Sequence, residues 1–140
     1  MTIVIDASIA VKWFLQEENS ELSRQLLAEY DDLVAPELIL IEVISAITKA
    51  VRTQRITREE AEQHCQSWLK VVANGLITLI PDALHLEQAT TLSLEQAHSF
   101  QDCLYLAAAQ QGTAPLATQD DKLRQKATEI DVEVVNLGEV

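Results

Sequence analysis

The sequence predicts a three-layer α/β fold, in which helices cover both faces of a central parallel sheet. Short β-branched or apolar stretches alternate with longer segments of helical periodicity along the whole chain. The strand-like stretches are apolar on both faces, which is typical of strands buried between two helix layers. Gly and Pro number only three each, so the connections should be short. A chain of 140 residues can bury its own core, and residues 1–140 are expected to form a single domain.

The expected strands are short apolar runs bounded by turn residues, and they cover residues 2–5, 32–36, 76–80, 115–118 and 132–137. The expected helices between them cover residues 7–16, 19–30, 37–55, 57–74, 81–97, 98–113 and 120–130. The longest carries a core stripe of Ile39, Val43, Ile47 and Ala50 at helical spacing.

Several helix ends have local signals. Thr57 and Glu60 have the spacing of a capping box, and Gly75 stands where a helix C-cap favours glycine. Asp82 is expected to cap the helix at 81–97, and Gly112 to close the helix at 98–113.

Charge and composition exclude some classes of function. The chain has 10 Lys and Arg residues against 22 Asp and Glu residues, for a net charge of -12. This argues against broad, non-specific nucleic-acid binding, which needs a basic face, although bound metal ions can supply positive charge locally. Cys65 and Cys103 lack metal-site spacing and are expected to be reduced thiols. The first residues do not resemble a signal peptide and no apolar stretch is long enough for a membrane helix, so we expect a cytoplasmic protein.

Four carboxylates occupy unusual positions. Asp6 and Asp120 directly follow predicted strands, and sites in parallel α/β sheets form beyond the carboxyl ends of the strands. Glu42 lies within an apolar helix, and Asp102 in the first turn of another. Such acids are costly without partners. If they converge, they need a cation, and hard oxygen ligands suit Mg²⁺ or Mn²⁺.

Each acid also has a purely structural interpretation. Asp6 could be only an N-cap, Glu42 could lie on a solvated helix face, and Asp102 could form a capping box with Ser99. Asp120 could be a first-turn acid favoured by the helix dipole. Its neighbour Asp121 has capping-box spacing from Thr118, and we expect it to be the structural member of the pair.

Four segments, taken together and in order, resemble the PIN-domain family, and in particular the VapC-type toxins of bacterial toxin–antitoxin pairs. They are "VIDASIAVKWFLQEE" with an Asp-x-Ser motif, "LVAPELILIEVISAI" with the second acid, "AHSFQDCLYLAAAQQ" with the third, and "TAPLATQDDKL" with Thr-x-Asp. The resemblance extends over nearly the whole chain. Two positions depart from it: Ser45 stands where many relatives have Asn, and Gln101 where an aromatic residue often precedes the third acid.

The resemblance implies a PIN-like fold and an Mg²⁺- or Mn²⁺-dependent endoribonuclease that hydrolyses RNA phosphodiesters. Asp6, Asp102 and Asp120 would hold one or two metal ions, and Glu42 would be an outer ligand or would orient or deprotonate the attacking water. Ser8 and Thr118 would hydrogen-bond the carboxylates. The resemblance further implies a cognate antitoxin as partner, a homodimer, and DNA binding only through the antitoxin.

Substrate contacts are suggested by the helix at 37–55. Ser45, Lys49 and Arg52 follow Glu42 at i+3, i+7 and i+10, so the two basic side chains could reach RNA phosphates from the acidic site. A solvated basic face explains them equally well, and Lys12 is a weaker candidate. His64, His85 and His98 are expected to be structural or exposed, although His98 lies near the site.

Three alternatives remain open from the sequence. The chain could be a PIN-like RNA-processing nuclease without an antitoxin, or a non-catalytic acidic α/β interaction domain. A phosphoryl-accepting receiver domain also places acids at strand ends, but it needs a lysine after its last strand, and "VEVVNLGEV" has none.

Overall fold

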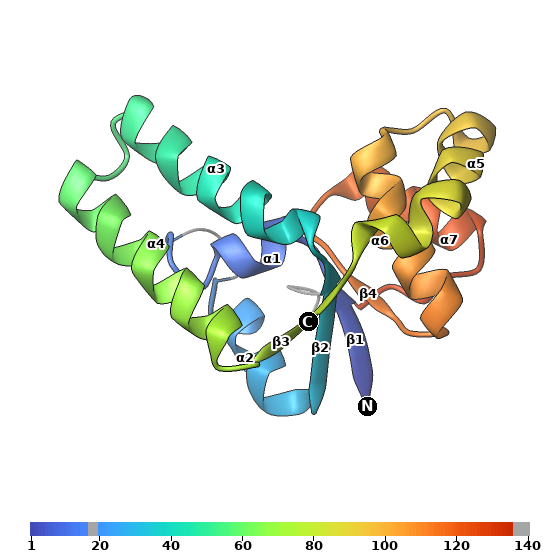
Figure 1. Ribbon diagram of the computed structural model, residues 1–140, viewed down its shortest axis with the longest axis horizontal. Helices are drawn as coiled ribbons and strands as arrows, with labels where there is room; N and C mark the ends of the chain where they lie inside the picture. The colour runs from blue at the N-terminus through green and yellow to red at the C-terminus, as the bar shows by residue number, and fades with distance from the viewer. Residues whose placement is uncertain (17–19, 136–140) are drawn as a thin grey trace.

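The computed structural model describes residues 1–16 and 20–135 (Figure 1). Its centre is a four-stranded sheet of β1 (Thr2–Ile5), β2 (Asp32–Pro36), β3 (Ile77–Ile80) and β4 (Leu116–Ala117). The strand order is β3-β2-β1-β4, and every pair is parallel. Because β1 and β4 are neighbours, the residues that follow these two strands meet at one edge of the sheet.

The helices are α1 (Ala7–Val11), α2 (Ser20–Glu29), α3 (Leu38–Arg52), α4 (Arg58–Ala73), α5 (Leu86–Gln96), α6 (Phe100–Gly112) and α7 (Asp121–Glu129), with a 3-10 turn, η1, at Asp82–His85. Figure 1 shows α1 to α4 on one side of the sheet and α5 to α7 on the other, so the predicted three-layer α/β fold is confirmed. None of the helices in the described part of the chain is long and apolar enough to cross a membrane.

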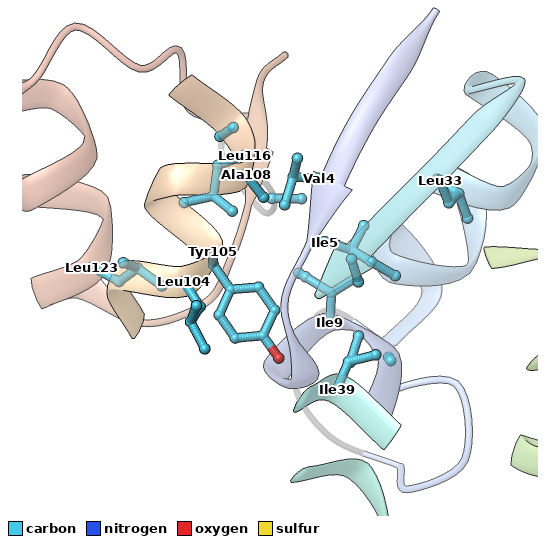
Figure 2. Packing of buried hydrophobic residues seen from close by; sticks show 14 of the residues in the cluster. Val4, Ile5, Ile9, Leu33, Ile39, Leu104, Tyr105, Ala108, Leu116 and Leu123 are labelled. Carbon is cyan, nitrogen blue, oxygen red and sulfur yellow. The ribbon is translucent and has the colours of Figure 1, made fainter. Parts of the chain in front are cut away.

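Helix α6 forms the centre of one layer. It packs against β1, β2 and β4, and its residues from Cys103 to Ala109 are all buried. A helix that is apolar on every side belongs inside a protein, and α5 covers the side of α6 that the sheet does not. Figure 2 shows the Tyr105 ring extending from α6 toward the end of β1, among the buried side chains of both.

Several features predicted from local sequence patterns are present in the structure. The stripe of Ile39, Val43, Ile47 and Ala50 is buried as predicted. The Thr57–Glu60 capping box is present at the start of α4, and Gly75 takes a left-handed φ of +75° after its end. The end of α6 differs from the prediction, because Thr113 and not Gly112 adopts the left-handed conformation there.

Three predicted elements are wrong in extent. The helix predicted at 7–16 ends at Val11. The N–H groups of residues 12 to 14 then donate to carbonyls three residues earlier, so the chain continues as turns. The helix at 81–97 begins as a 3-10 turn, because the Asp82 carboxylate accepts the Leu38 N–H (3.2 Å) of α3 and does not cap its own helix. The strand at 132–137 is only a bridge between Leu116 and Val134, since β4 offers two residues for pairing; residues 136 and 137 lie outside the described part.

Candidate active site

Asp6 lies at the junction of β1 and α1, with 6% of its surface exposed. Its Oδ1 accepts hydrogen bonds from the Ser8 hydroxyl (2.6 Å) and from the Ile9 N–H (3.3 Å). Its Oδ2 accepts a short hydrogen bond from the Thr118 hydroxyl. The Ile9 bond makes Asp6 the N-cap of α1, so the capping interpretation is confirmed. The cap uses one oxygen, while the other faces the end of β4.

Thr118 and Ser8 connect the ends of the two strands. The Thr118 hydroxyl is fully buried and also accepts the Asp120 N–H (3.1 Å). The Ser8 hydroxyl accepts the Gln119 N–H (2.9 Å). These bonds fix the chain after β4 against the start of α1, and they hold the Asp6 carboxylate in one orientation.

Glu42 lies in the second turn of α3 and is half-buried. Its Oε1 accepts a hydrogen bond of 2.6 Å from the Tyr105 hydroxyl. Tyr105 is 1% exposed and belongs to α6, three residues after Asp102. Tyr105 is not among the residues predicted from the sequence. The sequence feature that points to a role for Tyr105 is its position within the apolar stretch 103–109. A buried tyrosine hydroxyl usually has a polar partner.

Asp102 lies in the first turn of α6, where its N–H donates to the Ser99 hydroxyl (3.3 Å). Its carboxylate Oδ2 is 2.8 Å from His98 Nε2. The carbonyl of His98 in turn accepts a bond of 2.6 Å from the Ser93 hydroxyl, which fixes the turn between α5 and α6. Ser99 therefore caps α6, while the Asp102 side chain is oriented by His98.

The pKa shifts show that three of these acids share one environment. Burial raises the pKa of Asp6 to about 6, against the hydrogen bonds from Ser8, Thr118 and Ile9, and the charge of Asp102 raises it further. Burial also raises the pKa of Glu42; the Tyr105 hydrogen bond opposes this shift, and the charges of Asp102 and Asp82 add to it. The pKa of Tyr105 is raised, mainly by burial and then by Glu42, so its hydroxyl stays protonated and can donate.

Asp120 is placed differently from the other three acids. It is exposed, and its carboxylate accepts the Leu123 N–H (3.1 Å) as the N-cap of α7. The prediction that Asp121 caps this helix is therefore wrong. The Thr118 hydroxyl is engaged with Asp6 and with the Asp120 N–H, so the helix begins one residue after Asp120. Asp120 is joined to Asp6 through Thr118.

The donor chemistry of this cluster fits a hard divalent cation, since its groups are carboxylate and hydroxyl oxygens. As the side chains lie, no group of three or more His, Cys, Asp or Glu residues among 1–16 and 20–135 is arranged to hold a metal ion. The four predicted acids thus do not form a closed cage. Mg²⁺ usually keeps several waters and binds one or two carboxylates together with substrate phosphates. Asp6 and Asp102, whose charges act on one another, are the candidate carboxylates for such a site.

The predicted substrate residues do not share one hollow. Lys12, 8% exposed, lines a hollow of about 390 Å³ together with Ser8, Glu42 and Gln119. Lys49 lines a neighbouring hollow of about 410 Å³ between α1 and α3. Arg52 instead lines a hollow of about 490 Å³ between α3 and α4, and Ser45 is exposed on α3. Lys49 and Arg52 therefore do not extend along one surface from Glu42.

Comparison with known families decides the classification, because residues 3–129 match the family model of the PIN domain. The chain belongs to the PIN domain family. PIN domains are typically metal-dependent nucleases. No curated protein sequence matches this PIN domain significantly.

Several solved structures have the same fold at low sequence identity. PAE2754 from Pyrobaculum aerophilum is 19% identical with a TM-score of 0.72, over 96% of this chain and 83% of that one. VapC20 from Mycobacterium tuberculosis, a toxin that cleaves the sarcin–ricin loop, is 16% identical with a TM-score of 0.67, over 88% and 93%. VapBC2 from Rickettsia felis, solved with a DNA fragment from its promoter, is 15% identical with a TM-score of 0.65, over 98% and 99%.

Proposed function

We propose that this PIN domain is an Mg²⁺- or Mn²⁺-dependent endoribonuclease and the toxin of a toxin–antitoxin pair. The observation that supports it most is the buried Asp6 carboxylate at the end of β1, whose pKa is raised to about 6 by burial and by Asp102. Ionising a buried acid beside a second acid is unfavourable. A divalent cation would reverse that cost, because it is the largest local charge in such a site.

In this proposal Asp6, Asp102 and Asp120 hold the ion directly or through water, and Glu42 is an outer ligand or orients the attacking water. A bound ion would stabilise the charge that develops on the phosphodiester and would lower the pKa of a nucleophilic water. Supporting residues fix the acids, as partners of metal ligands commonly do. Ser8 and Thr118 hold Asp6, His98 holds Asp102, and Tyr105 holds Glu42.

The proposed partners are an RNA substrate, a cognate antitoxin and a second copy of the chain, with DNA bound only through the antitoxin. Support comes from structural neighbours that were solved as toxin–antitoxin assemblies, including one from Klebsiella pneumoniae with a TM-score of 0.62. The gene immediately upstream provides a test. We expect it to encode a short protein with a DNA-binding start and an amphipathic tail, and we expect that protein to inhibit cleavage.

The direct test of the activity is cleavage of structured RNAs with Mg²⁺ and with EDTA. The parent should cleave only with the metal, and Asp6→Asn, Asp102→Asn and Asp120→Asn should each abolish cleavage. Asp120→Asn is informative because Asn is as good an N-cap as Asp, so the variant removes the charge while it keeps the start of α7. Asp121→Asn is the matched control beside it and should keep the parent's activity.

Other results would point to the alternatives. Metal-dependent cleavage that persists in folded Asp6→Asn or Asp102→Asn protein would refute the assigned site. Cleavage that no upstream product inhibits would favour an RNA-processing nuclease without an antitoxin. A protein that neither cleaves RNA nor gains thermal stability from Mn²⁺ would be a non-catalytic interaction domain.

A further inference from the structure

His98 places a nitrogen donor beside one of the proposed acids. It directly precedes Ser99, the N-cap of α6, and its Nε2 is 2.8 Å from Oδ2 of Asp102 in the first turn of that helix. The two side chains expose 11% and 27% of their surface, so the pair is partly buried and still reached by solvent. The charge of Asp102 acts on both Asp6 and Glu42. His98 therefore belongs to the acidic site, where the four proposed acids offer only oxygen donors.

The backbone of His98 is fixed on both sides by Ser93. The His98 N–H donates to the Ser93 carbonyl (3.3 Å), and the His98 carbonyl accepts the Ser93 hydroxyl (2.6 Å). Ala97, the C-cap of α5, has a left-handed φ of 51°, which turns the chain toward α6. A group that is already held in place loses little conformational freedom when it binds a ligand. The imidazole is therefore positioned beside Asp102 before any ion binds.

Helix capping does not account for this pair. The Ser99 hydroxyl already accepts the Asp102 N–H (3.3 Å), so the first turn of α6 has its cap without His98. Side chains four positions apart add little to the stability of a helix, and a histidine–carboxylate contact that solvent reaches adds little to that of a protein. The stability of α6 therefore does not require an imidazole at position 98.

The spacing of the two donor atoms suits ligands of one ion. Bonds from a divalent cation to nitrogen or oxygen are about 2.1 Å long, so neighbouring ligands of an octahedral site lie about 3 Å apart. Nε2 of His98 and Oδ2 of Asp102 are separated by 2.8 Å. An ion can therefore replace the hydrogen bond between them with little movement of either side chain. Coordination uses the lone pair of Nε2, so the imidazole would then carry its proton on Nδ1.

We propose that His98 and Asp102 bind the divalent ion of this site together, and that His98 makes the site favour a transition-series cation over Mg²⁺. This inference rests on the proposed function, which places an ion at the acidic site, and adds the choice of ion. Carboxylates and water suit Mg²⁺, whereas an imidazole suits transition cations, whose affinity for such ligands rises from Mn²⁺ to Co²⁺. Asp6 contributes the second carboxylate, directly or through water.

The test compares three cations on metal-free protein in the absence of RNA. His98→Gln keeps an amide that can hydrogen-bond Asp102 but removes the imidazole nitrogen. His85→Gln is the matched control, at a half-buried histidine of η1. Thermal unfolding confirms that both variants fold. Titration calorimetry at constant ionic strength then measures Kd for Mg²⁺, Mn²⁺ and Co²⁺, and pulsed electron paramagnetic resonance detects whether a nitrogen nucleus is coupled to the bound Mn²⁺.

We expect His98→Gln to weaken the binding of Mn²⁺ about tenfold, a usual effect of losing a group from a metal site. The loss should be larger for Co²⁺ and much smaller for Mg²⁺, because only the transition cations gain from the imidazole. Parent protein should show nitrogen coupling to Mn²⁺, and His98→Gln should lack it. His85→Gln should match the parent in all of these measurements.

Two results would overturn the proposal. An equal loss of affinity for the three cations in His98→Gln would mean that His98 only orients Asp102. Parent protein without nitrogen coupling, or coupling that persists in His98→Gln, would mean that His98 is not a ligand. The parent spectrum needs no variant, so it decides the question even if His98→Gln fails to fold.

The two proposals can fail separately. If the parent cleaves RNA with Mg²⁺ but shows no nitrogen coupling to Mn²⁺, the role of His98 is wrong and the ribonuclease stands. If the parent binds Mn²⁺ through His98 but cleaves no RNA with any of the three cations, the metal site stands and the catalytic proposal fails.

Discussion

Asp6 is ionised at neutral pH only against the cost of its burial. Its pKa in the folded protein is about 6, compared with an ordinary value of 3.8. A folded state that binds the proton more tightly than the unfolded chain is most stabilised at low pH. Asp6 therefore contributes its stability below about pH 4, and that contribution is lost as the pH rises through 6.

The stability of the Asp6→Asn variant relative to the parent should therefore depend on pH. In metal-free protein, the stability of Asp6→Asn relative to the parent should increase between pH 4 and pH 7 by about 3 kcal/mol, which is the shift of about two pH units converted at about 1.4 kcal/mol each. Urea unfolding in EDTA at several pH values measures it. A stability difference that does not change with pH would show that Asp6 ionises without cost.

Tyr105 connects two catalytic candidates across the core, since it lies one turn from Asp102 and donates to Glu42. Tyr105→Phe should lower the stability by about 1 kcal/mol, the usual effect of losing one hydrogen bond. It should also reduce kcat about tenfold, because Glu42 is no longer held in one orientation. Unfolding and cleavage assays measure the two effects.

A double-mutant cycle separates positioning from packing. In a Glu42→Ala background, Tyr105→Phe should have little further effect on kcat, since the group that it orients is gone. Equal losses of kcat in both backgrounds would mean that Tyr105 acts only through the core. Tyr30→Phe, at a half-buried tyrosine on the N-terminal half of the chain, is a suitable control.

At the scale of elements, the start of α3 is fixed by residues from the end of β3. The Asp82 carboxylate accepts the Leu38 N–H, and the Glu37 carboxylate accepts the Asp82 N–H (3.2 Å). This exchange satisfies a free N–H at the first turn of α3. It also sets the position of the helix that carries Glu42.

Asp82→Ala should therefore destabilise the protein by about 1 kcal/mol, the usual cost of a lost cap, and should lower RNA cleavage as well. Thr57→Ala is the matched control, because it removes the cap of α4 at a similar cost while α4 carries none of the proposed acids. Chemical denaturation and initial cleavage rates provide the comparison. If both variants lose activity in equal measure, the loss reflects stability and not the position of α3.

For the whole molecule, the net charge of -12 means that any bound cation acts within an acidic field. We expect Mn²⁺ to raise the thermal midpoint of metal-free parent protein, by an amount that corresponds to about 2.7 kcal/mol at 100 times Kd. Asp6→Asn and Asp102→Asn should lose this shift, while Asp121→Asn should keep it. Scanning fluorimetry at constant ionic strength measures the midpoints. A shift that survives in Asp6→Asn would place the ion elsewhere on the acidic surface.

Local patterns in the sequence were enough to predict the layers of the fold and most of the candidate acids. Alternating strand and helix patterns are local, and so are the α3 core stripe, the Thr57 capping box and the position of Asp6 directly after a strand. Each of these features depends on residues only a few positions apart, so it can be recognised in the sequence without the structure. The four PIN-like segments added the order in which the acids occur.

Long-range packing, in contrast, selected the partner that each polar group takes. Tyr105 bonds Glu42 across 63 positions and Thr118 bonds Asp6 across 112, while Asp82 caps a helix 44 positions away from it. Those pairings made Asp120, and not Asp121, the cap of α7. The physical reason is that a hydrogen-bonding group is satisfied by whichever partner the packed core brings within reach, and separation along the chain does not enter that choice.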